Sequence, residues 1–194
     1  MRSTYDVAIF LNSDFQEGFA AKARDIIINQ QATAPLFSLI SDLIINSNLN
    51  IYSNIKKRDL PRVEFRAAYV LEYIYFYDNN LLTPFYDKFF YLFPKVTNGS
   101  TKRHFAKILT DILKNNRYRG DIDRIDDIAA ACVEWIIDKK VRVAVKVWAV
   151  ESLILLREDV NWLPEMFNEV LDQLSVNPSS GLKVRLSRWR ELQL

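Results

Sequence analysis

The sequence predicts an all-α fold, an α–α superhelix built from stacked antiparallel helix pairs. Hydrophobic residues make up 49% of the 194 residues and charged residues 26%, a balance typical of globular proteins. Only four Gly and six Pro interrupt the chain, which favours long helices with short connections over a many-stranded β fold. Apolar residues also recur at helical spacing along most of the length.

The first 60 residues predict a short helical cap, one helix pair and a loop. Residues 5–11 form the cap, and residues 14–29 and 35–45 form the pair. The stretch 46–60 is polar and weakly periodic, so we expect a loop there that carries at most one helical turn.

The helical pattern is strongest from Pro61 onward. Proline suits the first turn of a helix because its missing N–H would have no partner there. Ser100 or Thr101 is suited to cap another helix, and the carboxylates near Asp121 suit the positive end of a third. The expected helices are 61–77, 81–95, 100–115, 122–137, 139–157, 162–174 and 182–194.

Four of these helices carry a basic residue followed by a similar apolar stripe. The residues are Arg66, Arg103, Lys146 and Arg185, and they recur at intervals of roughly 40 residues. Helix-pair repeats of the HEAT and armadillo type have periods of about 40–47 residues, and each pair buries its second face only against a neighbour. The sequence therefore predicts a single helical-repeat domain over residues 1–194, with the clearest repeats in residues 61–194.

Four segments also resemble a group of small bacterial HEAT-like proteins that are sometimes labelled adenylosuccinate lyase. They are FRAAYVLEYI (65–74), NGSTKRHFAKIL (98–109), AVKVWAVESLILL (144–156) and SSGLKVRLSRWREL (179–192). The resemblance implies a HEAT-like stack, but the residues do not support a lyase. The signature loop of that enzyme superfamily reads roughly Gly-Ser-Ser-x-Met-Pro-x-Lys-x-Asn, and the nearest string here, from Pro178 to Lys183, lacks the Met-Pro and the Asn.

No sequence pattern points to catalysis, a cofactor or a metal. Phosphate-binding glycine loops, zinc-protease motifs and hydrolase nucleophile motifs are absent from the sequence. We interpret His104, the only histidine, as a surface or interhelical hydrogen-bonding residue, and Cys132 as a buried inert thiol. A small enzyme stays open only if a deep pocket with an acidic partner lies beside His104.

The density of aromatic residues between Tyr69 and Phe93 exceeds what one inward helix face can hold. We assign Tyr73, Tyr77, Phe85 and Phe89 to the core. Four others are then expected near the surface, where they contact a neighbouring repeat or form a protein-binding or dimer surface. These candidates are Tyr75, Tyr86, Phe90 and Tyr91.

Charge alternates between the two helices of each later pair. The first helices are basic and the second ones acidic, which predicts an acidic inner face and a basic outer ridge if the stack is HEAT-like. The ridge candidates are Arg66, Arg103, Lys107, Lys146 and Arg185. A nucleic-acid-binding HEAT-like protein would need a basic inner face, so the pattern disfavours that role. The alternative is that basic and acidic helices simply pair with each other.

The leading hypothesis from the sequence is a non-catalytic helical-repeat scaffold that binds a protein or peptide. The alternative is a nucleic-acid-binding or DNA-repair HEAT-like protein that uses the basic ridge, and a homodimer stays open. We expect no membrane partner and a cytoplasmic location, because no stretch approaches about 20 uncharged apolar residues and the first apolar run is too short for a signal peptide.

Overall fold

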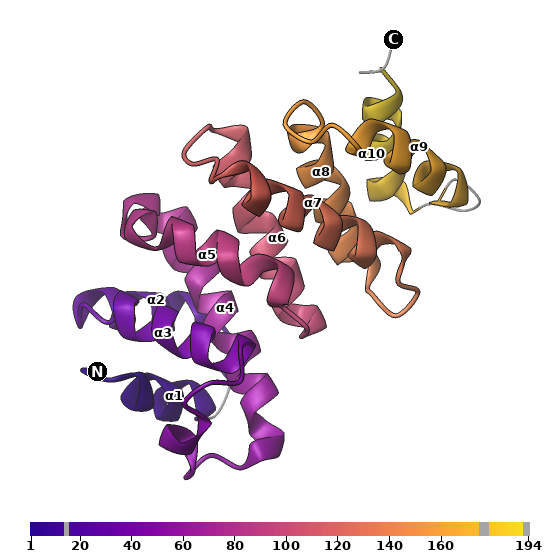
Figure 1. The fold of residues 1–194 in the computed structure, drawn as a ribbon. Helices are drawn as coiled ribbons and strands as arrows, with labels where there is room; N and C mark the ends of the chain where they lie inside the picture. Colours follow the sequence, from indigo (N-terminus) through magenta and orange to yellow (C-terminus); the bar gives the residue numbers. More distant parts are fainter. Residues whose placement is uncertain (14–15, 175–178, 192–194) are drawn as a thin grey trace. The chain divides into compact units, whose positions relative to one another are not determined.

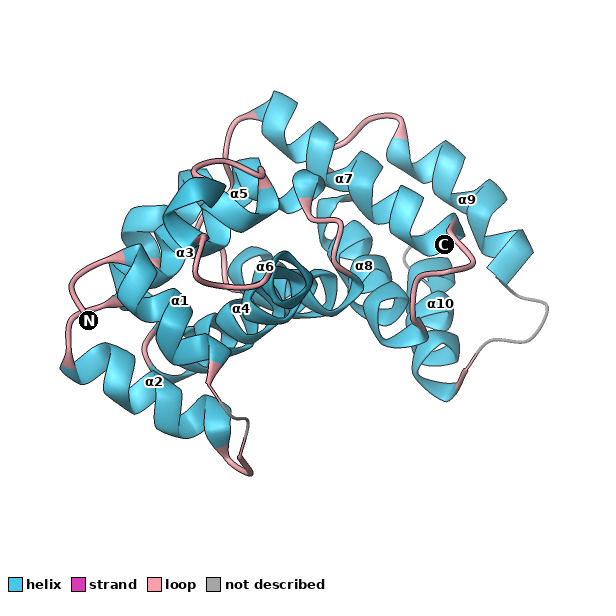
Figure 2. Cartoon of the chain, turned by 90° about the horizontal axis from the view of Figure 1, so that it is seen from below, coloured by secondary structure: helices cyan, strands magenta, loops and turns pink. Residues whose placement is uncertain are grey.

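The computed structural model describes residues 1–13, 16–174 and 179–191, and all regular elements in these ranges are helices (Figures 1 and 2). Ten α-helices and five short 3₁₀-helices lie in the described ranges, with no strand among them. The prediction of an all-α protein is therefore confirmed. None of the described helices is both long and apolar enough to cross a membrane.

The chain divides into two compact units, residues 1–105 and 106–194, with the boundary inside helix α6 (Gly99–Lys114). The expectation of one repeat domain over the whole chain stays a prediction.

Unit 1 is organised around the long helix α4 (Leu60–Tyr77), which packs against the three helices that precede it. Arg66 of α4 is buried and donates hydrogen bonds to the carbonyl oxygens of Leu11 and Ser13, at 2.7 and 2.6 Å. A cation at the end of a helix satisfies carbonyls that lack a partner within that helix. The three preceding helices are α1 (Thr4–Asn12), α2 (Phe19–Asn29) and α3 (Thr33–Ile44).

Helix boundaries in unit 1 follow local capping signals. A capping box between Ser3 and Asp6 starts α1, and Pro61 lies in the first turn of α4 as predicted. Helix α2 begins at Phe19, directly after Gly18, whose φ of 71° favours glycine. The predicted start of that helix at Asp14 lies outside the described residues. The predicted loop 46–60 contains two 3₁₀ turns, Leu49–Tyr52 and Lys57–Asp59.

The prediction of one continuous helix over residues 81–95 is wrong. The structure has two 3₁₀ turns (Asn79–Leu81 and Thr83–Phe85), a short helix α5 (Tyr86–Leu92) and a third turn (Phe93–Lys95). Pro84 and Pro94 explain the break, because a proline lacks the N–H that a continuing helix needs and its ring clashes with the preceding turn.

Unit 2 is organised around α8 (Val143–Leu156), which packs against α7 (Ile122–Ile137) on one side and α10 (Ser180–Glu191) on another. Helix α9 (Leu163–Leu174) contacts α7. Helix α7 has the bounds that the sequence predicts, with Asp121 accepting a hydrogen bond from the Arg124 amide at 2.8 Å. Helix α8 starts four residues later than predicted, at Val143, and the predicted end of the last helix, 192–194, lies outside the described residues.

Candidate functional site

Three of the four aromatic residues that we expected near the surface are buried. Tyr75, Tyr86 and Phe90 lie in the core of unit 1, and only Tyr91 is exposed. Tyr77, which we assigned to the core, is instead 64% exposed. Of the four residues predicted to form an aromatic surface, only Tyr91 therefore lies at the surface.

The error arose from treating each helix as having one inward face. Helix α4 packs against α1, α2 and α3, and also contacts α6 through His104. A helix with neighbours on several sides is apolar around most of its circumference. Tyr75 is therefore buried, although it lies on a different face from Tyr73.

The basic ridge is also only partly a surface feature. Arg66 is buried against carbonyls of α1, so it does not belong to an exposed ridge. Lys146 is half-buried and donates to the carbonyl oxygen of Ile136 at 2.7 Å, and its burial lowers its pKa, which the Asp138 carboxylate partly opposes. Arg103 is exposed and Lys107 is half-buried.

His104 makes an interhelical contact, one of the two roles expected for it. Its Nδ1 lies 2.5 Å from Oε2 of Glu72, and both side chains are buried in unit 1. The rings of Phe65 and Tyr69 lie 5.6 and 4.9 Å from the imidazole. An acidic partner is thus present, but the imidazole is enclosed by helix contacts, and it lines neither of two surface pockets of unit 1.

The remaining reactive side chains are also held in structural roles. Cys132 is fully buried, as predicted, and burial raises the pKa of its thiol. Within the described residues, no group of three or more His, Cys, Asp or Glu side chains is placed to hold a metal ion.

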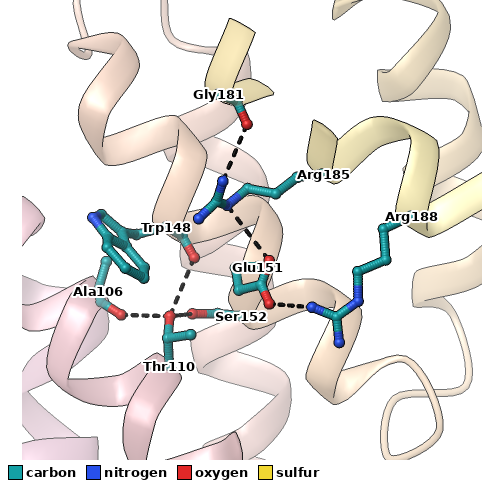
Figure 3. A network of polar contacts seen from close by, with 8 residues as sticks. All are labelled: Ala106, Thr110, Trp148, Glu151, Ser152, Gly181, Arg185 and Arg188. Carbon is teal, nitrogen blue, oxygen red and sulfur yellow. Dashed lines mark hydrogen bonds and ion pairs between the residues drawn. The ribbon is translucent and has the colours of Figure 1, made fainter. Parts of the chain in front are cut away.

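A polar network links three helices of unit 2 (Figure 3). The Thr110 hydroxyl of α6 lies 2.7 Å from the Ala106 carbonyl oxygen and 2.9 Å from the Ser152 hydroxyl of α8. The Thr110 and Ser152 hydroxyls pair across the α6–α8 contact, so they stabilise the packing of the two helices.

The other part of the network joins α8 to α10. The Glu151 carboxylate accepts a hydrogen bond from Arg188 Nη1 at 2.5 Å, and its other oxygen lies 3.4 Å from Arg185 Nε. Figure 3 marks both contacts. Arg185 also packs over the ring of Trp148, 5.5 Å from its centroid. Arg185 is thus held by contacts within unit 2, which explains why it is not a freely exposed member of the predicted ridge.

Sequence reasoning missed the two carboxylates at the centre of these contacts, Glu72 and Glu151. Each is a lone acid in an otherwise apolar helical segment, which is a signal for a buried partner. Their partners lie 32 and 37 residues further along the chain, so sequence alone gave no way to pair them.

An apolar groove lies beside α2 in unit 1 and encloses about 240 Å³. We call it the α2 groove. Its apolar walls come from Phe10, Phe19, Ala23 and Ile26, and its polar edge from Ser13, Gln16 and Lys22. On the same helix, the Arg24 guanidinium lies 4.7 Å from the centroid of the exposed Tyr77 ring.

Sequence reasoning also missed a basic run before α4. Lys56, Lys57 and Arg58 are consecutive and all exposed. The Asn98 amide donates to the Pro61 carbonyl oxygen at 2.8 Å, so the start of α6, with the exposed Arg103, lies near the same end of α4. The signal was visible in the sequence as the only Lys-Lys-Arg run of that region.

Comparison with known proteins finds no matching family model, no matching curated protein and no matching solved structure.

Proposed function

We propose that this chain is a non-catalytic helical-repeat scaffold that binds a protein or peptide partner in the α2 groove. The groove is the observation that carries the proposal. Its apolar walls form a hollow at the surface into which an apolar side chain of a partner can pack. A pocket lined by two aromatic rings suits an apolar anchor side chain, which is how many peptides bind helical proteins.

A recurring helix contact supports the repeat part of the proposal. In unit 1, α4 contacts α6 through Asn98–Pro61 and His104–Glu72, which are 37 and 32 residues apart. In unit 2, α8 contacts α10 through Arg188–Glu151, which are 37 residues apart. The helices of each pair also run in the same direction. Equivalent helices of successive HEAT-like repeats are expected to pack in this way, one repeat length apart.

Lys22 gives the proposed groove a preference for the charge of its partner. Among the described residues that line the groove it is the only charged one, and it is exposed. An acidic residue next to the apolar anchor would therefore be favoured electrostatically, while a basic one would be repelled. The partner that fits is a peptide segment with an apolar anchor and a neighbouring carboxylate.

Selection from a displayed random peptide library tests this proposal. Peptides that bind the full chain should be enriched in an apolar anchor beside an acidic residue. Their affinity should fall at least about tenfold in Ile26→Glu, because the new carboxylate lies on the groove wall. The matched control is Ile45→Glu, because Ile26 and Ile45 are both 38% exposed and only Ile26 lines the groove. The proposal fails if no peptide is enriched, or if both variants bind the selected peptides as well as the parent.

A second candidate function is nucleic-acid binding, and the exposed Lys56-Lys57-Arg58 run is what favours it. A phosphate-dependent contact should weaken steeply with salt. We expect duplex DNA binding, measured by fluorescence anisotropy over a salt series, to be lost when Lys56, Lys57 and Arg58 are changed to Glu. Unchanged binding in that variant, or no binding of the parent at low salt, would rule out this surface.

A further inference from the structure

A second pocket of unit 1, outside the α2 groove, carries opposite charges on its walls. It encloses about 230 Å³ between α3 and the start of α5. We call it the α3 pocket. Its lining residues are Phe37, Ser38, Ser41, Asp42, Phe85 and Lys88.

The carboxylate of Asp42 is held in place by neutral donors. Its Oδ1 accepts from the Ser47 hydroxyl at 3.1 Å and from the Asn48 amide at 3.0 Å. Its Oδ2 accepts from the Tyr52 hydroxyl at 2.8 Å. Burial, together with the neighbouring Asp42, raises the pKa of Tyr52 to about 12, so the phenol keeps its proton and remains a donor at neutral pH. These bonds orient the carboxylate without neutralising its charge.

Neither charge of the α3 pocket is compensated within the described part of the chain. Asp42 forms no ion pair there, and Lys88 forms neither an ion pair nor a hydrogen bond. The two groups line one pocket but do not pair with each other. A pocket lined by one acidic and one basic residue complements a molecule that carries both charges.

The third wall of the pocket is aromatic. The Phe37 and Phe85 rings stack with their centroids 4.8 Å apart and an interplanar angle of 21°, and Phe37 is buried. This stack offers an apolar surface for an uncharged part of a ligand. The volume is below the range of about 300–1,000 Å³ of most ligand sites, so a cofactor or nucleotide is too large.

We propose that the α3 pocket binds a small zwitterion of the free α-amino acid class. The ammonium group of the ligand lies against Asp42, its carboxylate against Lys88, and its side chain on the Phe37–Phe85 stack. A simple amine is disfavoured because Lys88 repels it, and a simple carboxylic acid is disfavoured because Asp42 repels it. The hydroxyls of Ser38 and Ser41 supply further hydrogen-bonding groups on the wall.

Ligand-observed NMR on the full chain tests the proposal with each standard L-amino acid as the probe. We expect saturation transfer to at least one apolar member, with a Kd below about 10 mM. For leucine, the single-charge analogues isoamylamine and 4-methylpentanoate should bind at least about tenfold more weakly. No binding by any amino acid, or equal binding of the single-charge analogues of the best ligand, would overturn the proposal.

Two variants locate the ligand without disturbing the bonds that hold Asp42. Lys88→Met removes the ammonium group and should weaken binding about tenfold, and Ser38→Tyr places a bulky side chain at an exposed position on the pocket wall and should abolish it. Lys57→Met is the matched control, because Lys57 is exposed and does not line the pocket. If Ser38→Tyr and Lys88→Met bind as the parent does, the ligand lies elsewhere and the proposal is wrong.

Discussion

Two glutamates of α4 are buried, and they differ in what surrounds their carboxyl groups. Glu72 meets the imidazole of His104 at 2.5 Å. Glu64 faces the hydroxyl of Thr101, and its Oε1 has no hydrogen-bond partner. Burial therefore raises the pKa of Glu64, which the Thr101 hydroxyl only partly opposes.

The raised pKa of Glu64 predicts a pH-dependent loss of stability. As the pH rises through the unfolded carboxyl's value near 4.5, the unfolded chain releases this proton before the folded chain does, so the free energy of unfolding falls until the pH passes the raised folded value. Glu64→Gln removes that loss. We expect the variant to gain stability over the parent at about pH 8 relative to about pH 4, measured by urea unfolding at both values. If the difference in free energy of unfolding between variant and parent were equal at the two pH values, the prediction would be contradicted.

At the scale of helices, α7 and α4 show what the sequence could predict. Their bounds depend on local signals, namely the Asp121 cap and Pro61, which act within one turn. The division of the 81–95 segment also had a local signal, Pro84, which the predicted continuous helix overlooked.

The faces of the helices were harder to predict than their ends. Periodicity identifies an apolar face but not how many neighbours a helix has, and so Tyr75 and Tyr77 were assigned to the wrong sides. The α3 pocket could not be predicted at all, because Asp42 and Lys88 line the same pocket only when α3 packs against the segment around Phe85.

Helix α10 provides a prediction at the same scale. The Glu151 carboxylate joins α8 to α10 through a hydrogen bond from Arg188 and an ion pair with Arg185, and a hydrogen bond to a charged group contributes about 1.5–3 kcal/mol. Glu151→Ala should therefore speed amide hydrogen exchange in α10 by about tenfold or more, with a smaller effect in α7. The control is Glu158→Ala, which removes a carboxylate that is 78% exposed and should change neither helix. Unchanged exchange in α10 would show that its apolar contacts alone hold it on α8.

For the whole molecule, the similar contacts of α4 with α6 and of α8 with α10 have a consequence for how stability is distributed. In a stack of repeats, each repeat is stabilised by its immediate neighbours, so damage to one repeat should weaken the adjacent helices before distant ones. A single cooperative core would instead lose stability everywhere at once. The two architectures therefore predict different spatial patterns of amide exchange after a mutation in the core.

Leu153 of α8 and Leu39 of α3 are suited to this test because both are fully buried. Leu153→Ala should cost about 2–5 kcal/mol locally and speed exchange in α8 and α10, while α1 to α3 keep their protection. Leu39→Ala should produce the reverse pattern, with the largest loss of protection in α1, α3 and α4. Because each variant serves as the control for the other, uniform loss of protection across the chain in both would contradict the helical-repeat proposal.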